Sequence, residues 1–571
     1  MKPASDRDSS SELDRRSVAE AGRLAGLAHE AQPQLAELTQ QRVDAIVARM
    51  AAVAAEQAES LAAAAVDETG YGVRADKILK NLFAARTVYD FIRPMKTVGV
   101  IRRLEERRVV EIAEPFGVVA AIVPSTNPTS TTIYKLLIAL KARCAIVISP
   151  HPAAAGCVGR TVEVMARAAR DAGAPAGAIT CMTAVTLEGT QALMQDRRVA
   201  VILATGGMGL VRAAYSAGKP AYGVGPGNAP AYIERSADVT KAVRDIVTGK
   251  TFDNGLLCSS ENSVVVDAGI AEEVRREFTA QGGYFLRAAE AETLASALVT
   301  PRRLPNPAFV GRTAVEIADR VGLQVPEHTR ALIAPLDGVG RDHPLSIEKL
   351  CPVLSFYVAD DWRAACERCR EILRYGGMGH TMAIHSRDEA IILEFGLRKP
   401  AFRIVVNTPT TLGSIGMTTG LDPSMTLGCG GYGGNITSDN ISPRHLLNVK
   451  RLAYETRPAS DTADALLTGS EAAAAMPVQH RQPGRRHQSP GLDAGLVAGR
   501  VDALLASHDG TAASPPADGA PAAVEFVCED DVRAALRESR PIVVDERTIV
   551  TPAARDLAER HGVFAGRGAG R

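Results

Sequence analysis

The sequence has few aromatic residues and no excess of either charge. Of its 571 residues 4% are aromatic, with one Trp, and 65 Lys and Arg residues balance 65 Asp and Glu residues. A chain of zero net charge lacks the basic surface that bulk binding to nucleic acid or to an anionic membrane requires. The composition therefore predicts no nucleic-acid partner and no membrane partner. Hydrophobic residues make up 46% of the chain, enough for a large core in two or three domains.

Long apolar runs are also absent. No uninterrupted apolar segment is long enough to span a bilayer, and residues 1–11 lack the apolar core of a signal peptide. The nine cysteines follow no repeating spacing, which is typical of free thiols in a reducing compartment and predicts a cytoplasmic protein. Cys366 and Cys369 lie in a helical pattern with no second pair and no nearby His, so no metal site is predicted.

What the sequence does contain is an alternation of apolar strands and helices. Residues 12–95 have apolar positions at helical spacing, and residues 98–113 form a predicted hairpin around a charged turn. Apolar strands separated by helices are predicted at 117–124, 144–149, 178–182 and 199–204. Such strands belong to a parallel sheet covered on both faces, which binds ligands at the carboxyl ends of its strands. A second set of strands and helices follows from 251 to about 410, so the predicted fold class is α/β.

Composition shifts after residue 455. Residues 455–524 contain no Phe, Trp or Tyr and are rich in Ala, Pro, Gly, Ser and Arg, which predicts a disordered linker. Inside it, residues 491–506 place their apolar side chains on one face of a predicted helix, which either docks on a partner or packs on its own chain. Residues 525–571 form a predicted small module of two helices and a strand.

One cysteine lies where a thiol nucleophile is useful. Cys258 sits between a Gly-containing turn and the β-type run 263–266, so its backbone amide is free to donate. A thiol and a free amide are two parts of a thioester-forming site, the nucleophile and the oxyanion donor. A lone Cys is also commonly a small buried hydrophobe, so the interpretation depends on the other parts of such a site.

Asn127 is a candidate for a second oxyanion donor. It lies between Pro124 and Pro128, which fix the backbone where a strand is predicted to end. A side-chain amide held there suits an oxyanion hole, although an Asn in this place can equally shape the turn.

Two glycine-rich loops are candidates for cofactor binding. Thr205, Gly206 and Gly207 follow a predicted strand and lead into a helix, whose N-terminal amides can bind a dinucleotide phosphate. Gly225 and Pro226 lie in a second glycine-rich turn, where glycine allows close backbone approach to a ligand. Neither loop has the G-x-G-x-x-G spacing, and a simple turn explains the second equally well.

Residues 13 to about 455 resemble the CoA-acylating branch of the aldehyde dehydrogenase superfamily. The motifs that carry the resemblance occur in order along the chain and are Glu114-Pro-Phe-Gly, Ile122-Val-Pro-Ser-Thr-Asn, Ile148-Ser-Pro-His, Leu203-Ala-Thr-Gly-Gly, Lys250-Thr-Phe-Asp-Asn-Gly, Glu348-Lys-Leu-Cys-Pro, Gly379-His-Thr and Thr426-Leu-Gly-Cys-Gly. The resemblance implies the aldehyde dehydrogenase fold, with a Rossmann-like cofactor domain, a second α/β catalytic domain and an oligomerisation hairpin. The predicted parts are a flexible N-terminus over 1–12, a cofactor-binding domain over 13–250, a catalytic domain over 251–425, a return to the cofactor-binding region over 426–455, the linker over 456–524 and the small module over 525–571.

The resemblance also implies roles for individual residues. Cys258 matches the nucleophile and Asn127 the oxyanion-hole amide. Glu348 matches the carboxylate that contacts the nicotinamide ribose, and residues 205–207 match the loop near the cofactor's phosphates. His380 matches a histidine near the active site, which either acts as a base for Cys258 or the CoA thiol or makes a structural hydrogen bond.

Two departures from the hydrolytic members of the superfamily are informative. Val224 stands where those members carry a general-base Glu, and valine cannot activate water, so the thioester should survive until the CoA thiolate attacks. Ser149, Pro150 and His151 stand where those members have a Lys on the adenosine ribose, which leaves both NAD and NADP open as the cofactor.

The predicted reaction converts a short-chain aldehyde, CoA and NAD(P) to acyl-CoA and NAD(P)H. Acetaldehyde, propionaldehyde and sulfoacetaldehyde all fit this prediction. A hydrolytic dehydrogenase that yields a free acid and a catalytically silent scaffold protein are the alternatives.

The resemblance extends to assembly. The hairpin 98–113 and the strand 446–454 resemble the superfamily's oligomerisation elements, which predicts a homodimer or tetramer. Residues 548–558 resemble segments of enzymes from bacterial microcompartments. By that resemblance 491–506 is an encapsulation peptide, it and 525–571 bind shell proteins, and the microcompartment lumen is the alternative location.

Overall fold

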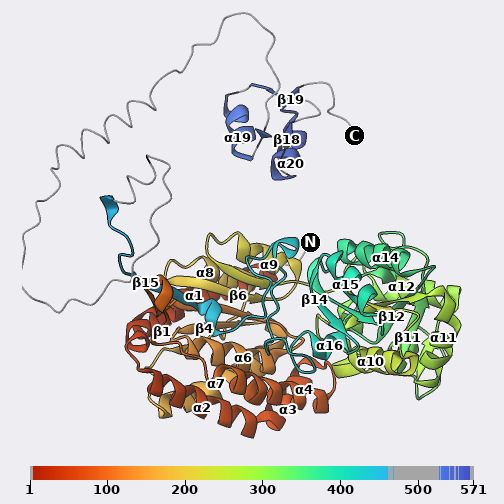
Figure 1. Ribbon diagram of the computed structural model, residues 1–571, viewed down its shortest axis with the longest axis horizontal. Helices are drawn as coiled ribbons and strands as arrows, with labels where there is room; N and C mark the ends of the chain where they lie inside the picture. The colour runs from red at the N-terminus through yellow and green to blue at the C-terminus, as the bar shows by residue number, and fades with distance from the viewer. Residues whose placement is uncertain are drawn as a thin grey trace, which may run out of the picture. The chain divides into compact units, whose positions relative to one another are not determined.

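The computed structural model describes residues 4–460, Leu467 and residues 526–565 apart from 528, 539, 545–547 and 551. The chain divides into two compact units, Met1–Ala475 and Met476–Arg571 (Figure 1). The predicted helix over 491–506 and most of the predicted linker lie outside the described residues.

Helices open the first unit, as the sequence predicts. They are α1 Ala4–Ala36, α2 Gln40–Glu56, α3 Ala58–Thr69 and α4 Arg74–Leu82, the last of which continues through a π-helical turn, Phe83–Val88, into α5 Tyr89–Ile92. The first helix, α1, begins at Ala4 and so includes most of the segment 1–12 that the sequence predicts to be a flexible N-terminus. Once a helix has nucleated, each added residue gains a backbone hydrogen bond, so the pattern that starts near residue 13 extends towards the N-terminus.

A five-stranded parallel sheet forms the centre of the predicted cofactor domain. Its strands are β3 Val118–Val123, β4 Ile146–Pro150, β5 Ile179–Cys181, β6 Val199–Thr205 and β7 Ala221–Val224, in the order β5-β4-β3-β6-β7. The connecting helices are α6 Pro128–Lys141, α7 Ala155–Asp171, α8 Leu187–Gln195 and α9 Met208–Tyr215. Figure 1 shows α8 on one side of this sheet and α6 with α7 on the other. The predicted parallel sheet with two covered faces is confirmed.

A second parallel sheet has seven strands in the order β10-β11-β12-β9-β8-β13-β14. The strands are β8 Ala229–Ile233, β9 Glu261–Asp267, β10 Gly283–Phe285, β11 Ala331–Pro335, β12 Val353–Ala359, β13 Gly379–His385 and β14 Ala401–Val406. The main helices around it are α10 Val239–Thr251, α11 Ala271–Ala280, α12 Ala288–Leu298, α13 Ala314–Arg320, α14 Trp362–Tyr375 and α15 Glu389–Leu397.

The boundary predicted at residues 250 and 251 is wrong, because β8 and α10 already belong to the second set. Pro230 lies in β8 and is unusual in a central strand, since it cannot donate to the ladder. The structure accommodates it at a shift of register between Ala229 and Pro230. A five-residue strand that contains a proline and follows a glycine-rich turn carries no clear strand signal.

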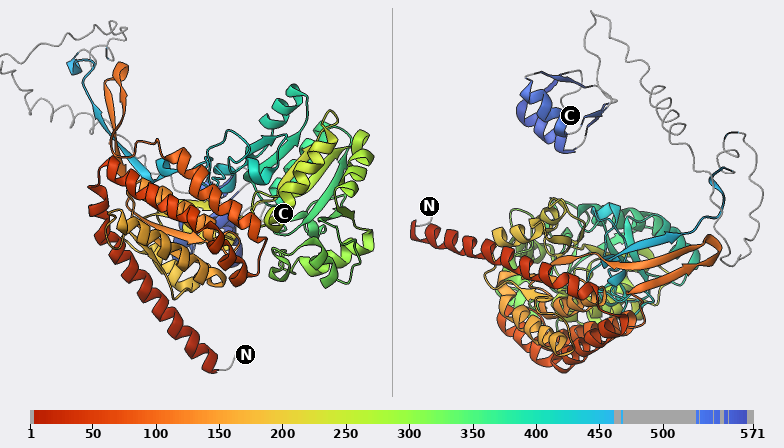
Figure 2. Two further views of the ribbon diagram at one scale, coloured as in Figure 1. Left: turned by 90° about the horizontal axis from the view of Figure 1, so that it is seen from below. Right: turned by 90° about the vertical axis from the view of Figure 1, so that its left-hand side faces the viewer.

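The predicted hairpin and the late strand form one antiparallel sheet of their own. β1 Gly99–Leu104 pairs with β2 Val109–Pro115, and β15 Leu447–Ala453 pairs with the other edge of β2. Figure 2 shows the three strands extending away from the body of the first unit. Chain segments more than 300 residues apart in sequence therefore meet in this sheet.

The second unit contains a small α/β module. Its elements are β16 Phe526–Val527, α19 Glu529–Arg537, β17 Ile542–Val543, β18 Ile549–Val550, α20 Pro552–His561 and β19 Phe564–Ala565. The strands pair as β16-β18 and β17-β19, and apolar side chains such as Val532, Ala535 and Ala558 are buried between them and the helices. Two helices and a strand lie close to where the sequence predicts them.

The described part of the chain can be checked for disulfides, metal-binding clusters and membrane-spanning helices. All eight described cysteines are free thiols. No cluster of His, Cys, Asp and Glu there has the arrangement of a metal site. Each described helix is too short or too polar to traverse a bilayer.

Candidate active site

A cavity of about 480 Å³ opens where the carboxyl ends of β3, β4, β6 and β7 face the loop that carries Cys258. Predicted site residues that line it are Asn127, Pro150, His151, Thr205, Gly206, Gly207, Gly225, Pro226, Cys258 and Glu348. Ser149 and His380 are not among the lining residues. The structure thus brings most of the predicted site together around one thiol, from loops of both sheets.

The loop before Cys258 is held in an unusual backbone conformation. Asp253 and Asn254 have φ values of 48° and 53°, and Gly255 follows with 73°. Left-handed φ values are costly for residues with a Cβ, although Asp and Asn tolerate them best. Side-chain contacts fix the turn: Asp253 accepts a hydrogen bond from the Val73 amide at 2.7 Å, and Asn254 donates to the Gly311 carbonyl at 2.9 Å. Backbone strain held in a buried loop is typical of functional sites.

The Cys258 thiol is protonated at neutral pH. Burial raises its pKa to about 12, and the neighbouring Glu348 carboxylate contributes in the same direction. Arg403 and the residue's own backbone amide act in the opposite direction but do not compensate. An oxyanion donor must face the oxygen of the attacked carbonyl, and the Cys258 amide is a candidate because it lies on the residue that carries the nucleophile.

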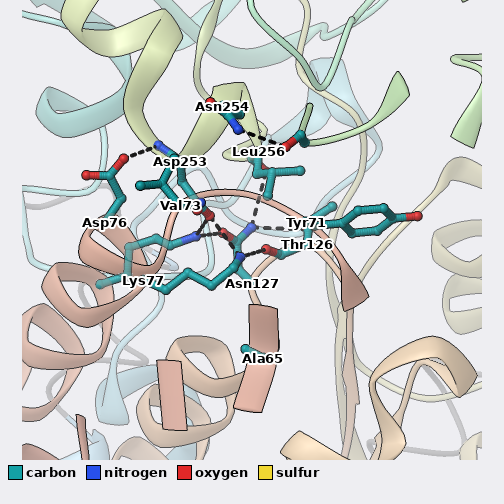
Figure 3. A network of polar contacts seen from close by, with 12 residues as sticks. Ala65, Tyr71, Val73, Asp76, Lys77, Thr126, Asn127, Asp253, Asn254 and Leu256 are labelled. Carbon is teal, nitrogen blue, oxygen red and sulfur yellow. Dashed lines mark hydrogen bonds and ion pairs between the residues drawn. The ribbon is translucent and has the colours of Figure 1, made fainter. Parts of the chain in front are cut away.

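Asn127 faces the same loop. It precedes α6, and its side chain does not cap that helix. The Nδ2 group donates to the Leu256 carbonyl at 3.3 Å and to Thr126 Oγ1 at 3.1 Å, while Oδ1 accepts from Lys80 Nζ at 2.5 Å (Figure 3). The amide donor therefore points towards the backbone two residues before Cys258.

Glu348 lines the same cavity. One of its carboxylate oxygens accepts a hydrogen bond from the Gly227 amide at 2.7 Å. Burial raises its pKa to about 7, which the Gly227 amide and the nearby Lys250 and Lys349 only partly offset. It is the one carboxylate among the described residues that line this cavity. Its second oxygen is left to accept a hydrogen bond from a ligand hydroxyl.

The loop after β6 fits the phosphate and ribose part of a dinucleotide. Gly207 precedes α9 in an extended conformation and lines the cavity, and no side chain caps the start of that helix. Thr205 Oγ1 is buried at the cavity wall without a hydrogen-bond partner in the described part of the chain. Buried hydroxyls are normally paired, so an unpaired one beside a cavity suits a ligand. Val224 is buried and lines the same wall.

Ser149 and His151 have different surroundings although they are two residues apart. The Ser149 hydroxyl shares a hydrogen bond with Thr190 Oγ1 at 2.9 Å and is fully buried, so it points away from the cavity. His151 lines the cavity, its Nδ1 accepts from the Ala153 amide at 3.1 Å, and burial lowers its pKa. No Lys or Arg occurs among the described residues around this cavity.

His380 lies directly behind the cavity wall. It is 1% exposed, and its Nδ1 shares a hydrogen bond with Thr381 Oγ1 at 3.0 Å, while Nε2 has no partner in the described residues. Burial, assisted by Arg403, lowers its pKa to about 3. Gly227 lies between the Cys258 carbonyl and the His380 ring. A Cβ on Gly227 would overlap that carbonyl and come 3.2 Å from the ring.

A second cavity of about 500 Å³ meets the first at Gly225, Pro226 and Glu348. Three arginines, Arg212, Arg303 and Arg374, line it, and they come from α9, an irregular loop and the end of α14. They are far apart in the sequence and follow no motif. Sequence reasoning therefore did not identify them, and only the fold gathers them.

The chain is similar to known proteins over most of its length. A family model described as "Aldehyde dehydrogenase family" matches residues 1–302. The bifunctional aldehyde-alcohol dehydrogenase of Escherichia coli K12 is 41% identical over 441 residues, which are 76% of this chain and 49% of that protein. The chain thus spans about half the length of the curated aldehyde-alcohol dehydrogenases that it matches. The acetylating succinate-semialdehyde dehydrogenase of Clostridium kluyveri is 38% identical over 75% of this chain and 94% of its own length.

The chain is also similar to solved structures of aldehyde dehydrogenases. An acetylating aldehyde dehydrogenase from Geobacillus thermoglucosidasius is 50% identical, with a TM-score of 0.77, and the match covers 78% of this chain and 98% of that one. A propionaldehyde dehydrogenase from the fucose utilisation microcompartment of Clostridium phytofermentans is 28% identical, with a TM-score of 0.69, over 76% and 97% of the two chains. The predicted aldehyde dehydrogenase fold is confirmed by these matches.

Proposed function

The chain belongs to the aldehyde dehydrogenase family, and from this premise we propose that it is a CoA-acylating aldehyde dehydrogenase. Its reaction would convert a short-chain aldehyde, CoA and NAD to acyl-CoA, NADH and a proton. The observation that carries the proposal is Val224, which lines the cavity where hydrolytic members have their general-base Glu. A valine cannot deprotonate water, so a thioester formed in this cavity is left for a stronger nucleophile. The acylating relatives support the same reaction.

The first half of the reaction forms a thioester on Cys258. The Cys258 thiol first loses its proton to solvent, and the thiolate then attacks the aldehyde carbon. The negative charge that develops on oxygen is stabilised by Asn127 Nδ2 and the Cys258 amide. When bound, the nicotinamide would supply the hydride acceptor; Glu348 would hold its ribose, and Thr205 would lie near the phosphates of the cofactor. The products of this half-reaction are the acyl-Cys258 thioester and the reduced cofactor.

In the second half, the CoA thiolate attacks the thioester carbonyl and the Cys258 thiolate leaves. One sulfur–carbon bond forms as another breaks, so the exchange is nearly isoenergetic and runs in either direction. His380 is the proposed acceptor of the CoA thiol proton. Its Nε2 has no hydrogen-bond partner among the described residues, which supports this role, and burial is the main cause of its low pKa.

The two cavities differ in the charges of their lining residues, and this difference supports a different ligand group for each cavity. The first cavity has no described Lys or Arg, so it lacks a cation for a 2′-phosphate, which favours NAD over NADP. The arginines of the second cavity suit phosphate groups of a nucleotide co-substrate.

Arg303→Ala should raise the KM of the nucleotide co-substrate that binds in the second cavity. A raised KM for CoA alone identifies CoA phosphates, a raised KM for NAD alone identifies the dinucleotide, and unchanged values for both refute the site.

Assembly and location are further proposals. The exposed side chains of Val100 and Leu452 on the β1-β2-β15 sheet support its use as an interface of a homodimer or tetramer. A cytoplasmic location fits the free thiols. The microcompartment relative from Clostridium phytofermentans supports the lumen of a microcompartment as a second candidate location, with shell proteins as partners of the C-terminal segments.

NADH formation with and without CoA tests the proposed function. With NAD and aldehyde alone, we expect a burst of about one NADH per site and then a halt, because the thioester persists. Adding CoA should restore steady turnover, and Cys258→Ser should abolish both phases. Equal steady turnover without CoA would refute the proposal in favour of a hydrolytic enzyme.

A panel of acetaldehyde, propionaldehyde and sulfoacetaldehyde, compared by kcat/KM, identifies the substrate.

A further inference from the structure

A network of buried charges lies beneath Asn127. Lys77 and Lys80 on α4 and Asp253 before Cys258 are each exposed by 2% or less. Lys77 Nζ lies 3.0 Å from Asp253 Oδ2, and Lys80 Nζ contacts the same oxygen (Figure 3). The backbone amide of Asp253 donates to Asp76 at 2.7 Å. One carboxylate therefore holds two ammonium groups and also the strained turn that leads to Cys258.

A buried network of charges contributes little to the stability of a fold, because desolvation of the charges costs free energy. Removing charges from water costs several kcal/mol per ion, and well-packed apolar residues often serve stability better. A buried network of charges therefore calls for a functional explanation. Lys80 offers one, because it is bonded to the proposed oxyanion donor.

The chemistry of Lys80 dictates which way the Asn127 amide faces. An ammonium group has three donors and no acceptor, so the atom that Asn127 presents to it at 2.5 Å must be Oδ1. The Nδ2 donor is then turned to the other side, towards Leu256 and the Cys258 loop. Lys77 is bonded to Asp253 in the same way, but its other contact is the Thr126 carbonyl at 3.3 Å and not Asn127.

We propose that Lys80, held by Asp253, is a positioning residue that fixes the orientation of the Asn127 amide and so keeps the oxyanion hole directed at the carbon attacked by Cys258. This inference rests on the proposed function. Without the ammonium group, the amide could rotate and present its oxygen to the developing negative charge. A donor replaced by an acceptor would oppose thioester formation and not merely fail to assist it.

Lys80→Met and Lys77→Met form a matched pair for the test. Both remove one charge from the same carboxylate, one turn apart on α4, but only the first removes the contact with Asn127. Lys80→Met should lower the single-turnover rate of NADH formation about 10- to 100-fold, while Lys77→Met should lower it much less. Asn127→Ala combined with Lys80→Met should be no slower than Asn127→Ala alone.

Alkylation of Cys258 by iodoacetamide separates positioning from general damage. This displacement needs the thiolate but passes through no oxyanion, so Lys80→Met should alkylate at the parental rate. Equal loss of alkylation and NADH formation, equal loss in Lys77→Met, or full activity of Lys80→Met would each overturn the inference. Absence of CoA-dependent oxidation in the parent would instead overturn the proposed function, so the two failures are distinguishable.

The parent protein provides a second test that requires no variant. Burial lowers the pKa of Lys80 to about 8, against the opposing effects of Asp253 and Asp76 and with the effect of Lys77 added. A neutral amine can accept a hydrogen bond as well as donate, so the amide is no longer fixed above that pH. The burst rate divided by the alkylation rate, which cancels ionisation of Cys258, should fall above pH 8. A constant ratio between pH 7 and 10 would overturn the inference.

Discussion

The proposed reaction begins with ionisation of the Cys258 thiol. Because burial raises its pKa to about 12, the thiolate fraction should grow about tenfold with each pH unit throughout the neutral and alkaline range. We therefore expect the iodoacetamide alkylation rate of the ligand-free protein to rise about tenfold per unit from pH 7 to 10 without a plateau. Parallel measurements on Cys258→Ser subtract labelling of the other thiols. A plateau near pH 9, as for an ordinary exposed thiol, would contradict the raised pKa.

Residues differ in how far the sequence alone could identify them. Cys258, Asn127 and Glu348 stand in contiguous motifs, and their loops all reach one cavity. Ser149 belongs to an equally clear motif, but its hydroxyl turns inward to Thr190, and nothing in the local pattern specifies that rotamer. Lys80 is 47 residues from Asn127 in sequence. No local signal connects the two, so their contact could be found only in three dimensions.

Among connections between elements, the one from β7 to β8 is the most tightly constrained at the site. A Cβ on Gly227 would overlap the Cys258 carbonyl, and that backbone cannot yield without moving the nucleophile. Gly227→Ala should therefore lower the burst rate by about 100-fold or more and destabilise the fold by about 1–3 kcal/mol. Single-turnover kinetics and denaturant unfolding measure the two effects.

Gly159→Ala in α7 is the matched control. A Cβ there meets no atom within 4 Å, and alanine favours a helix over glycine by about 0.5–1 kcal/mol. The control should keep parental kinetics and gain stability. Parental kinetics in Gly227→Ala as well would show that the loop around Cys258 adjusts freely.

The elements themselves were predictable where their apolar pattern is strong. Continuous apolar runs predicted the strands β3, β4 and β6. The parallel pairing of these strands follows from the helices that connect them. β8 was missed because Pro230 contradicts a central strand and because the strand directly follows a glycine-rich turn. The pairing of β15 with β2 depends on contacts across most of the chain, for which local pattern gives no register.

For the whole molecule, the division into two units yields a direct prediction. All described residues that line the two cavities lie in the first unit. A chain shortened after Ala475 should therefore keep its CoA-dependent kcat/KM within about twofold, as expected for independent domains. Steady-state assays of both chains, with size-exclusion chromatography to confirm equal assembly, make the comparison. Loss of activity in a shortened chain that is still folded and assembled would show that the second unit contributes to catalysis.

The central claim for the whole molecule is that Cys258 carries an acyl group that CoA removes and water does not. Mass spectrometry of the peptide containing Cys258, after incubation with NAD and propionaldehyde, tests it most directly. We predict a propionyl adduct on Cys258 that persists without CoA and disappears when CoA is added, with propionyl-CoA as the product. An unmodified Cys258 accompanied by free propionate would contradict the account.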